Sequence, residues 1–191
     1  MKRHKRFKTI HILLAAASAG CLAGVLTLAL PSPIQLTRPP SAVTGRAPIT
    51  GKVIKVTDGD TITIRSGTDN IKIRLAEIDA PERGQPWGEK SRQVLDGLVA
   101  GKIVQAIPIT TDRYGRTVAR VMVDGTNVNR EMVAIGAAWA YRDYVRDPSI
   151  NSLETNAKTR AQGLWALDET ARIAPWDYRA RRRETAAMTS R

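Results

Sequence analysis

Residues 53–64 read VIKVTDGDTITI, and this stretch is the strongest local fold signal in the chain of 191 residues. β-Branched side chains flank the pair Asp58-Gly59, and Asp-Gly is a favoured pair for a tight turn. The stretch therefore predicts a β-hairpin, with strands at 53–56 and 61–64 and a connection at 57–60.

Further segments extend the hairpin into a small barrel. The sequence predicts additional strands at 71–75, 103–109 and 117–123, and a short extended piece at 138–141. Apolar stripes and capping residues predict helices at 88–100, 127–135 and 149–162. Five strands, with helices after the third and the fifth, predict a mainly β (α+β) fold, namely a five-stranded OB-fold barrel with about three helices.

The N-terminal part of the chain carries the pattern of an export segment. Five Lys or Arg residues fall within residues 1–8, and an apolar stretch follows at 10–30. Basic residues before an apolar run direct the following chain outward across a membrane, and this run reaches the roughly 20 residues that a spanning helix needs. Two outcomes stay open. The segment is either a hydrophobic helix that anchors the protein facing the periplasm or the extracellular side, or a signal whose cleavage leaves a secreted protein.

Composition predicts the remaining boundaries. Five prolines within 31–48 indicate an extended linker between the export segment (1–30) and the folded domain (49–170), which an Arg-rich tail (171–191) follows. The net charge of +12 lies mainly at the two ends of the chain, because residues 51–170 are nearly neutral. Bulk charge is therefore weak evidence that the folded domain binds nucleic acid.

The single cysteine and the two histidines exclude several classes of hydrolytic site. Cys21 lies inside the apolar run, and His4 and His11 lie before it or at its start. The predicted domain can therefore assemble neither a Ser-His-Asp triad nor a Cys/His zinc site. Hydrolysis by this domain would have to use carboxylates, arginines, tyrosines and a hard metal ion.

Three loop-like segments carry most of the candidate chemistry. They are DGDT at 58–61, RLAEIDAPE at 74–82 and DRYGR at 112–116. Taken singly, each segment has an ordinary interpretation as a turn or a solvated loop. What indicates a functional site is their combination and their order along the chain.

In order and approximate spacing, these segments resemble the signature segments of the thermonuclease (staphylococcal nuclease-like) family. The similarity continues through residues 127–129, 140–141 and 163–165, and covers about residues 50–168. It implies a monomeric, calcium-dependent nuclease that hydrolyses phosphodiester bonds of DNA and/or RNA with low sequence specificity and leaves 3′-phosphates. The alternative is a non-catalytic OB-fold module that binds nucleic acid or protein, since OB barrels serve many binding roles.

The resemblance assigns one Ca²⁺ ion to oxygen donors of this domain. Ca²⁺ takes roughly six to eight oxygen ligands, and the protein would supply the carboxylates of Asp60 and Asp79 and the backbone carbonyl of Ala80. A threonine is common in the family where Ala80 stands. Alanine is compatible with this role, because a carbonyl ligand does not depend on the side chain.

The resemblance also assigns catalytic roles to Arg74, Glu82 and Arg116. Glu82 would act as general base or would orient the attacking water. The two guanidinium groups can bind phosphate oxygens bidentately and would stabilise the negative charge that grows there as water adds to phosphorus. These five ionic residues, Asp60 and Asp79 included, occur together in this sequence, which favours an enzyme over a binding module.

Substrate contacts are assigned to Arg113, Tyr114 and Tyr141. Tyrosine rings stack on any base and so permit sequence-tolerant binding of single strands. The alternative for both tyrosines is a packing role. The loop at 83–87 is shorter than the lysine-rich loop of the best-known family member, so the resemblance does not extend to substrate preference.

One geometric requirement accompanies this assignment. Arg74 and Asp79 are five residues apart, and in a regular strand their side chains would point to opposite faces. Both can reach one phosphate only if the chain twists or bulges near Ile78.

Overall fold

The computed structural model describes residues 46–189. All of these residues belong to one compact unit, which spans residues 42–191. The predicted export helix and most of the predicted linker lie outside the described residues. Within residues 46–189, no helix is both long enough and apolar enough to cross a membrane.

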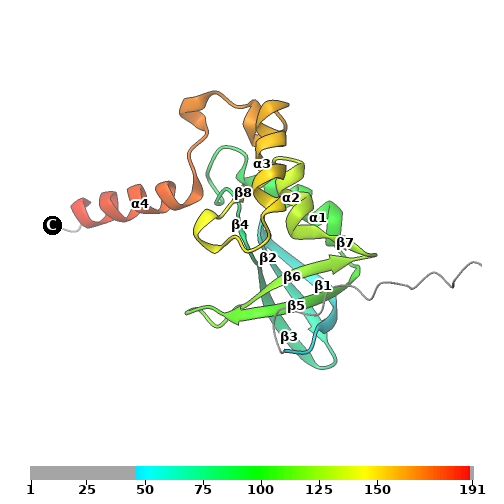
Figure 1. Ribbon diagram of the computed structural model, residues 1–191. Helices are drawn as coiled ribbons and strands as arrows, with labels where there is room; N and C mark the ends of the chain where they lie inside the picture. The colour runs from blue at the N-terminus through cyan, green and yellow to red at the C-terminus, as the bar shows by residue number, and fades with distance from the viewer. Residues whose placement is uncertain (1–45, 190–191) are drawn as a thin grey trace, which may run out of the picture. The chain divides into compact units, whose positions relative to one another are not determined.

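Five strands close into a barrel (Figure 1). The strands are β1 (Ile49–Asp58), β2 (Thr61–Ser66), β3 (Asp69–Leu75), β5 (Ile103–Thr111) and β6 (Thr117–Val123). They are hydrogen-bonded in the order β3-β2-β1-β5-β6, and a parallel pairing of β3 with β6 closes the circle. The predicted five-stranded, mainly β barrel of OB type is thereby confirmed.

The hairpin predicted at 53–64 is formed by β1 and β2. Asp58 and Thr61 are paired, so Gly59 and Asp60 make the turn. A side chain on Gly59 would collide with Ser91 and would place its Cβ 2.7 Å from that of Ala80. Glycine therefore allows the turn to lie directly against the segment that follows β3, and this contact brings Asp60 to the site.

Apolar side chains fill the barrel and the space between the barrel and its helices. Ile62, Ile73 and Val121 are fully buried on the strands, and Leu95 and Val99 are fully buried on helix α1 (Gly88–Val99). Helices α2 (Val128–Ala134) and α3 (Ser149–Thr159) lie with α1 at one end of the barrel in Figure 1. These helices thus cover one end of the barrel core.

The predicted helices are present with small differences in extent. The side chain of Asn127 accepts a hydrogen bond from the backbone N–H of Arg130 and caps α2, as the sequence predicts. Helix α3 ends at Thr159, before the predicted end at 162. The chain turns there because Ala161 adopts a positive φ of 48° ahead of Gly163. Within the predicted extended piece, β8 (Trp139–Ala140) pairs with β4 (Ile78–Asp79).

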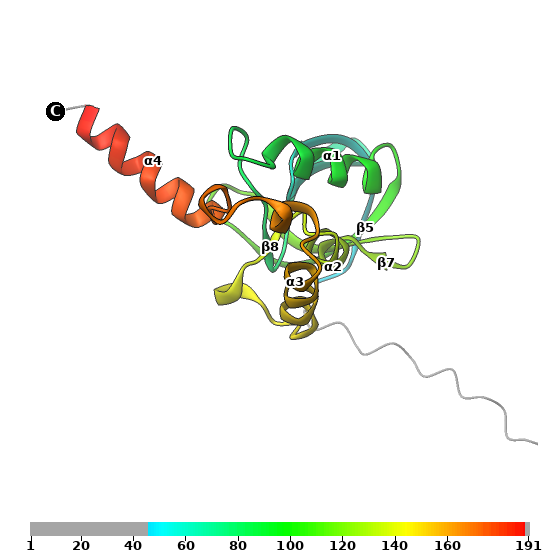
Figure 2. The same cartoon turned by 90° about the horizontal axis from the view of Figure 1, so that it is seen from above.

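A fourth helix is the main departure from the sequence prediction of about three. The predicted Arg-rich tail contains the 15-residue helix α4 (Pro175–Thr189). Figures 1 and 2 show it running away from the barrel, and residues 181–189 are all exposed. Proline at the first helical position and a sequence rich in Ala and Arg favour a helix here. No apolar stripe marks it, because only its first turns contact the rest of the domain.

Candidate active site

The turn between β3 and β4 is built around the guanidinium group of Arg74. Its Nη1 donates to the carbonyls of Leu75 (2.8 Å) and Ile78 (2.9 Å), and its Nη2 donates to Oδ1 of Asp79 (2.9 Å). The chain bends between these carbonyls at Glu77, where φ is 69°. The bend required to bring Arg74 and Asp79 together is therefore present, one residue before Ile78.

Hydrogen bonds to the buried carboxylate of Glu77 hold its backbone at this positive φ. It accepts bonds from Arg120 Nε (2.8 Å) and Nη2 (3.1 Å), and from the backbone N–H groups of Arg146 (2.7 Å) and Asp147 (2.8 Å). Burial opposes ionisation, but these donors lower the pKa of Glu77 overall. A network reaching from β6 and the segment before α3 thus fixes the turn that positions Asp79.

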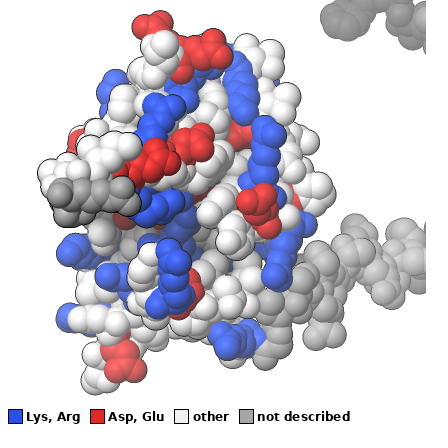
Figure 3. All heavy atoms as spheres, turned by 90° about the vertical axis from the view of Figure 1, so that its left-hand side faces the viewer, with Lys and Arg blue, Asp and Glu red and all other residues white. Residues whose placement is uncertain are grey.

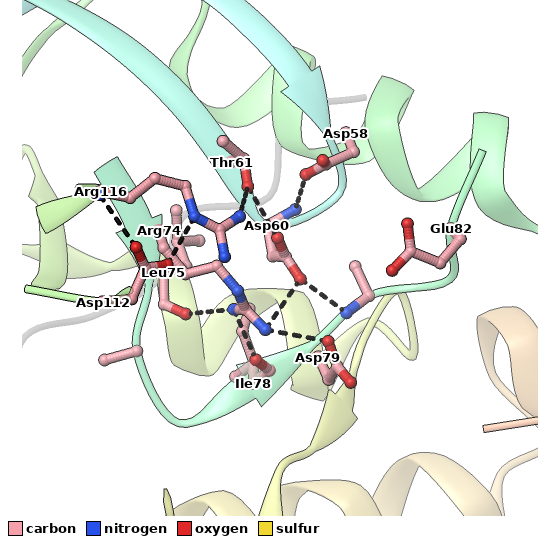
Figure 4. A network of polar contacts seen from close by, with 12 residues as sticks. Asp58, Asp60, Thr61, Arg74, Leu75, Ile78, Asp79, Glu82, Asp112 and Arg116 are labelled. Carbon is pink, nitrogen blue, oxygen red and sulfur yellow. Dashed lines mark hydrogen bonds and ion pairs between the residues drawn. The ribbon is translucent and has the colours of Figure 1, made fainter. Parts of the chain in front are cut away.

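Asp60 comes to the same place from the β1–β2 turn. Its Oδ2 accepts the backbone N–H of Ala80 (3.0 Å) and lies 3.3 Å from Nη2 of Arg74, while its Oδ1 accepts the hydroxyl of Thr61 (3.0 Å). Asp60 and Asp79 therefore share one guanidinium nitrogen. Figure 4 shows both carboxylates in one region with Glu82 and Arg116. The structure brings together the two aspartates and the Ala80 backbone, whose N–H bonds to Asp60. The sequence predicts both carboxylates and the Ala80 carbonyl as the metal ligands.

Several carboxyl groups lie close together in the site and are largely buried from solvent. Burial, with the neighbouring Asp60 carboxylate as the second cause, raises the pKa of Asp58 to about 7. Burial also raises the pKa of Asp79, although two arginines contact it. Burial alone would lower the pKa of Arg74, but the surrounding aspartates raise it overall.

A bound cation would relieve this crowding, and the donors are the oxygen atoms that Ca²⁺ prefers. Within the described residues, no three Asp, Glu, His or Cys side chains converge as a ready-made metal-binding group. The groups that could hold an ion here are the carboxylates of Asp60 and Asp79 and the backbone carbonyl of Ala80, with water or substrate oxygens to complete the shell.

Arg116 reaches the site from the turn between β5 and β6. Its Nε pairs with Oδ2 of Asp112 at 2.7 Å, and its Nη1 donates to the Thr61 hydroxyl at 3.3 Å. Asp112 also accepts the backbone N–H groups of Tyr114 and Arg116, and despite partial burial these bonds lower its pKa. Arg116 is thus held beside the Asp60–Thr61 pair by a carboxylate of its own turn.

The predicted substrate-binding residues lie in the same region of the domain as Asp60 and Arg116. Tyr114 is 69% exposed, its hydroxyl accepts a bond from Arg113 (2.8 Å), and the Arg113 guanidinium lies 4.9 Å from its ring centre. Tyr141 is half-buried and stacks on Trp176 of α4, with ring centres 5.6 Å apart. The exposed ring of Tyr114 therefore lies against the guanidinium groups of Arg113 and Arg116 (5.6 Å for the latter), whereas one face of Tyr141 is covered by Trp176.

One open cleft of about 880 Å³ unites the site. Its lining includes every residue that the sequence predicts for catalysis, metal binding or substrate contact: Asp60, Arg74, Asp79, Ala80, Glu82, Arg113, Tyr114, Arg116 and Tyr141. Asp58, Trp176, Arg179 and Arg183 also line it, and the sequence does not predict them as site residues. For the last three, the only signal in the sequence is an Arg-rich segment near the C-terminus.

Arg179 makes the closest of these unpredicted contacts. Its Nη2 lies 2.7 Å from Oδ2 of Asp79, and its Nη1 lies 2.7 Å from Oε1 of Glu82 and 3.3 Å from Oδ1 of Asp79. Burial opposes its charge, but the two carboxylates raise the pKa of Arg179 overall. Helix α4 is therefore part of the site.

Comparisons with known proteins agree with this geometry. The family described as "Staphylococcal nuclease homologue" matches residues 72–167. A protein of Escherichia coli described as an uncharacterized endonuclease is 42% identical over 137 residues, which cover 71% of this chain and 88% of the relative. A similarly described protein of Haemophilus influenzae is 44% identical over 128 residues (66% of this chain, 72% of the relative). Micrococcal nuclease of Shigella flexneri is 39% identical over 140 residues (68% and 79%).

The matched region contains the turn from Arg74 to Asp79, the Glu82 segment and the Arg116 turn, which together form a large part of the cleft. The chain therefore belongs to the staphylococcal nuclease family, and it is a hydrolytic nuclease of the endonuclease type.

Proposed function

We propose that the protein is a calcium-dependent endonuclease that cleaves DNA and/or RNA with low sequence specificity and leaves 3′-phosphate ends. The observation that carries the proposal is the shared contact of Asp60 and Asp79 with Arg74, with Glu82 and Arg116 lining the same cleft. This arrangement combines a place for a hard cation, a proton acceptor and the guanidinium group of Arg116 around one space.

Asp60, Asp79 and the carbonyl of Ala80 would hold the ion, and the ion would supply fixed positive charge to a phosphodiester oxygen. The chain supplies further charge through Arg116. Two of its nitrogens are occupied by Asp112 and Thr61, and within the described residues nothing pairs with its Nη2. Arg116 can therefore donate to phosphate oxygens and stabilise them most when their charge grows.

Arg74 is less able than Arg116 to donate hydrogen bonds to a phosphate, because both of its terminal nitrogens already have partners. Its Nη1 serves two backbone carbonyls, and its Nη2 serves Asp60 and Asp79. Only Nε remains for a phosphate oxygen without breaking these contacts. Its first effect is to hold the two metal-binding carboxylates together, and its charge adds to that of Arg116 at the phosphate.

Glu82 provides the proton acceptor. Its carboxylate is 36% exposed, so water can reach it, and in Figure 4 it lies beside the Asp60–Asp79 pair. It would accept a proton from the attacking water or orient that water by a hydrogen bond. With no histidine among residues 46–189, a carboxylate is the natural group for this role.

Low specificity follows from the kinds of contact that the cleft offers. Arginines contact phosphates, which carry no sequence information, and tyrosine rings stack on any base. Figure 3 shows basic side chains spread over the face from which α4 projects, with acidic groups among them. Such a surface favours a polyanionic strand without selecting bases.

The test incubates the full chain with denatured DNA and with RNA, with Ca²⁺ or with a chelator of Ca²⁺. We expect cleavage only with Ca²⁺, and fragments that polymerase extends only after a phosphatase removes the 3′-phosphate. Glu82→Gln should lose most of this activity, while Glu89→Gln, an exposed change on α1, should not. Tight binding of either polymer without cleavage would instead identify a non-catalytic binding module.

We also propose that the domain is exported. The support is the basic residues 1–8 followed by the apolar run 10–30. Cell fractionation should find the protein outside the cytoplasm, and replacing the five basic residues by Ser should reduce export. Normal export of that variant would contradict the proposal.

A further inference from the structure

We infer that Arg179, on helix α4, is a positioning residue that holds the carboxylate of Glu82 in the active site. The inference rests on the proposed function, in which Glu82 acts on the attacking water. It makes α4 a working part of the nuclease and not an appendage to the barrel.

The contacts of Glu82 carry the inference. Within residues 46–189, Arg179 is the only side chain that pairs with the Glu82 carboxylate, at 2.7 Å. The same guanidinium group contacts both oxygens of Asp79, whose side chain is 1% exposed and is fixed on its other side by Arg74. Arg179 therefore fixes a half-exposed carboxylate relative to a buried one.

A second connection joins Glu82 to the same part of the chain. The backbone N–H of Glu82 donates to the side chain of Gln85 (2.7 Å), and Gln85 donates to the carbonyl of Ile173 (3.0 Å), just before α4. Gln85 is buried, so this link is sheltered from solvent. Both the backbone and the side chain of Glu82 are thus tied to the segment 173–179.

The first turn of α4 is anchored well enough to direct Arg179. Trp176 stacks on Tyr141 and meets Trp139 edge-on, with ring centres 5.8 Å apart, while Pro175 is buried. Residues three apart share a helix face, so the face that places Trp176 on Tyr141 also turns Arg179 toward the cleft. The family match ends at residue 167, so it assigns no role to this helix.

The chemistry of arginine suits this position. Asp79 and Glu82 are like charges, and one planar guanidinium can bond to both carboxylates and offset their repulsion. A carboxylate without such a partner would sample several rotamers, and small misplacement of a catalytic group can lower the rate about 10²-fold.

If Arg179 mainly covered the cleft, its removal would raise activity. The experiment separates these effects.

The experiment is a double-mutant cycle in the full chain, with Arg179→Ala, Glu82→Gln and both together. We expect Arg179→Ala to lower kcat about 10²-fold with little change in KM, because the loss concerns the chemical step and not uniform binding. In the Glu82→Gln background, Arg179→Ala should cost little more. Arg181→Ala is the matched control, because it removes an exposed arginine of the same helix outside the cleft.

Two checks keep the result interpretable. Arg179→Met retains the apolar stem and removes the charge, so it replaces the alanine variant if that variant unfolds. A crystal structure of the Arg179 variant should show the Glu82 carboxylate displaced, and this measurement does not depend on activity.

Four outcomes would overturn the inference. They are additive losses in the cycle, an increase in kcat, an unchanged kcat beside an active wild type, or an undisplaced Glu82. If wild type and Arg181→Ala are both inert with Ca²⁺, the proposed function itself fails and the inference fails with it.

Discussion

The guanidinium group of Arg74 lies 2.9 Å from the carboxylate of Asp79, although the two residues are five positions apart in the sequence and a regular strand would point them to opposite faces. The positive φ of Glu77 makes this contact possible, and Arg120 and two backbone N–H groups hold Glu77 in that conformation. The proposed metal-binding and charge-stabilising roles of Asp79 and Arg74 therefore depend on one strained turn.

Arg116→Ala should lower kcat about 10²- to 10³-fold, the loss typical when one preorganised donor to a developing charge is removed. Arg116→Lys should recover little, because a lysine cannot both pair with Asp112 and offer a planar fork. Steady-state kinetics on denatured DNA will measure this. Arg113→Ala is the control in the same turn and should act mainly on KM. Equal effects of the two alanine changes on kcat would contradict the assignment.

Asp60→Asn and Asp79→Asn should each weaken Ca²⁺ binding, measured by titration calorimetry without substrate. Changing a group that only contacts a metal ligand typically lowers metal affinity about 10- to 100-fold. The affinity for Ca²⁺ should fall by more than this here, because each change removes the charge of a ligand itself. Asp69→Asn, at the exposed start of β3, should leave the affinity unchanged. Since Asp79 also pairs with Arg74 and Arg179, circular dichroism must show that its variant is folded. Wild-type affinity in both folded variants would exclude this metal site.

With a chelator present, Asp58→Asn should raise the melting temperature of the protein above about pH 7. Near pH 3.8, the ordinary pKa of an aspartate, it should change the melting temperature little. Burial and the Asp60 carboxylate raise the pKa of Asp58 from 3.8 to about 7. Between these values the native state binds the proton more tightly than the unfolded chain, so the contribution of Asp58 to stability falls as pH rises. The asparagine keeps the oxygen that accepts the Asp60 N–H.

The measurement for Asp58 is the difference between wild-type and variant melting temperatures across this pH range. Asp69→Asn again serves as control and should give a flat difference. If the difference for Asp58→Asn is also independent of pH, burial and Asp60 do not raise the pKa of Asp58.

Asn129→Ala should lower the free energy of unfolding by about 1–3 kcal/mol for each buried group that it leaves without a partner. Asn129 is fully buried, accepts the N–H of Val121 (2.9 Å) and donates to the carbonyls of Ala76 (2.9 Å) and Ala119 (3.1 Å). Urea titrations will measure the loss. Asn70→Ala removes an exposed asparagine and should cost far less. Similar costs for the two variants would refute this role.

Much of the fold was predictable because its signals are local. The hairpin at 53–64 depends on β-branched residues around a glycine turn, and the cap of α2 depends on one asparagine beside its own helix. The candidate site residues were also predictable, because carboxylates and arginines lie in three short segments whose order matches a family pattern. All of them line one cleft.

Sequence alone thus determined the barrel type and the identity of the ionic residues in the matched region. Tertiary structure decided how they meet: the bend at Glu77, the sharing of Arg74 by Asp60 and Asp79, and the arrival of Arg179 about a hundred residues after its partners. The physical reason is that periodicity and turn chemistry act over a few residues. The positive φ of Glu77 and the position of Arg179 on an otherwise exposed helix are both stabilised by partners from distant parts of the sequence, and only folding brings these partners close.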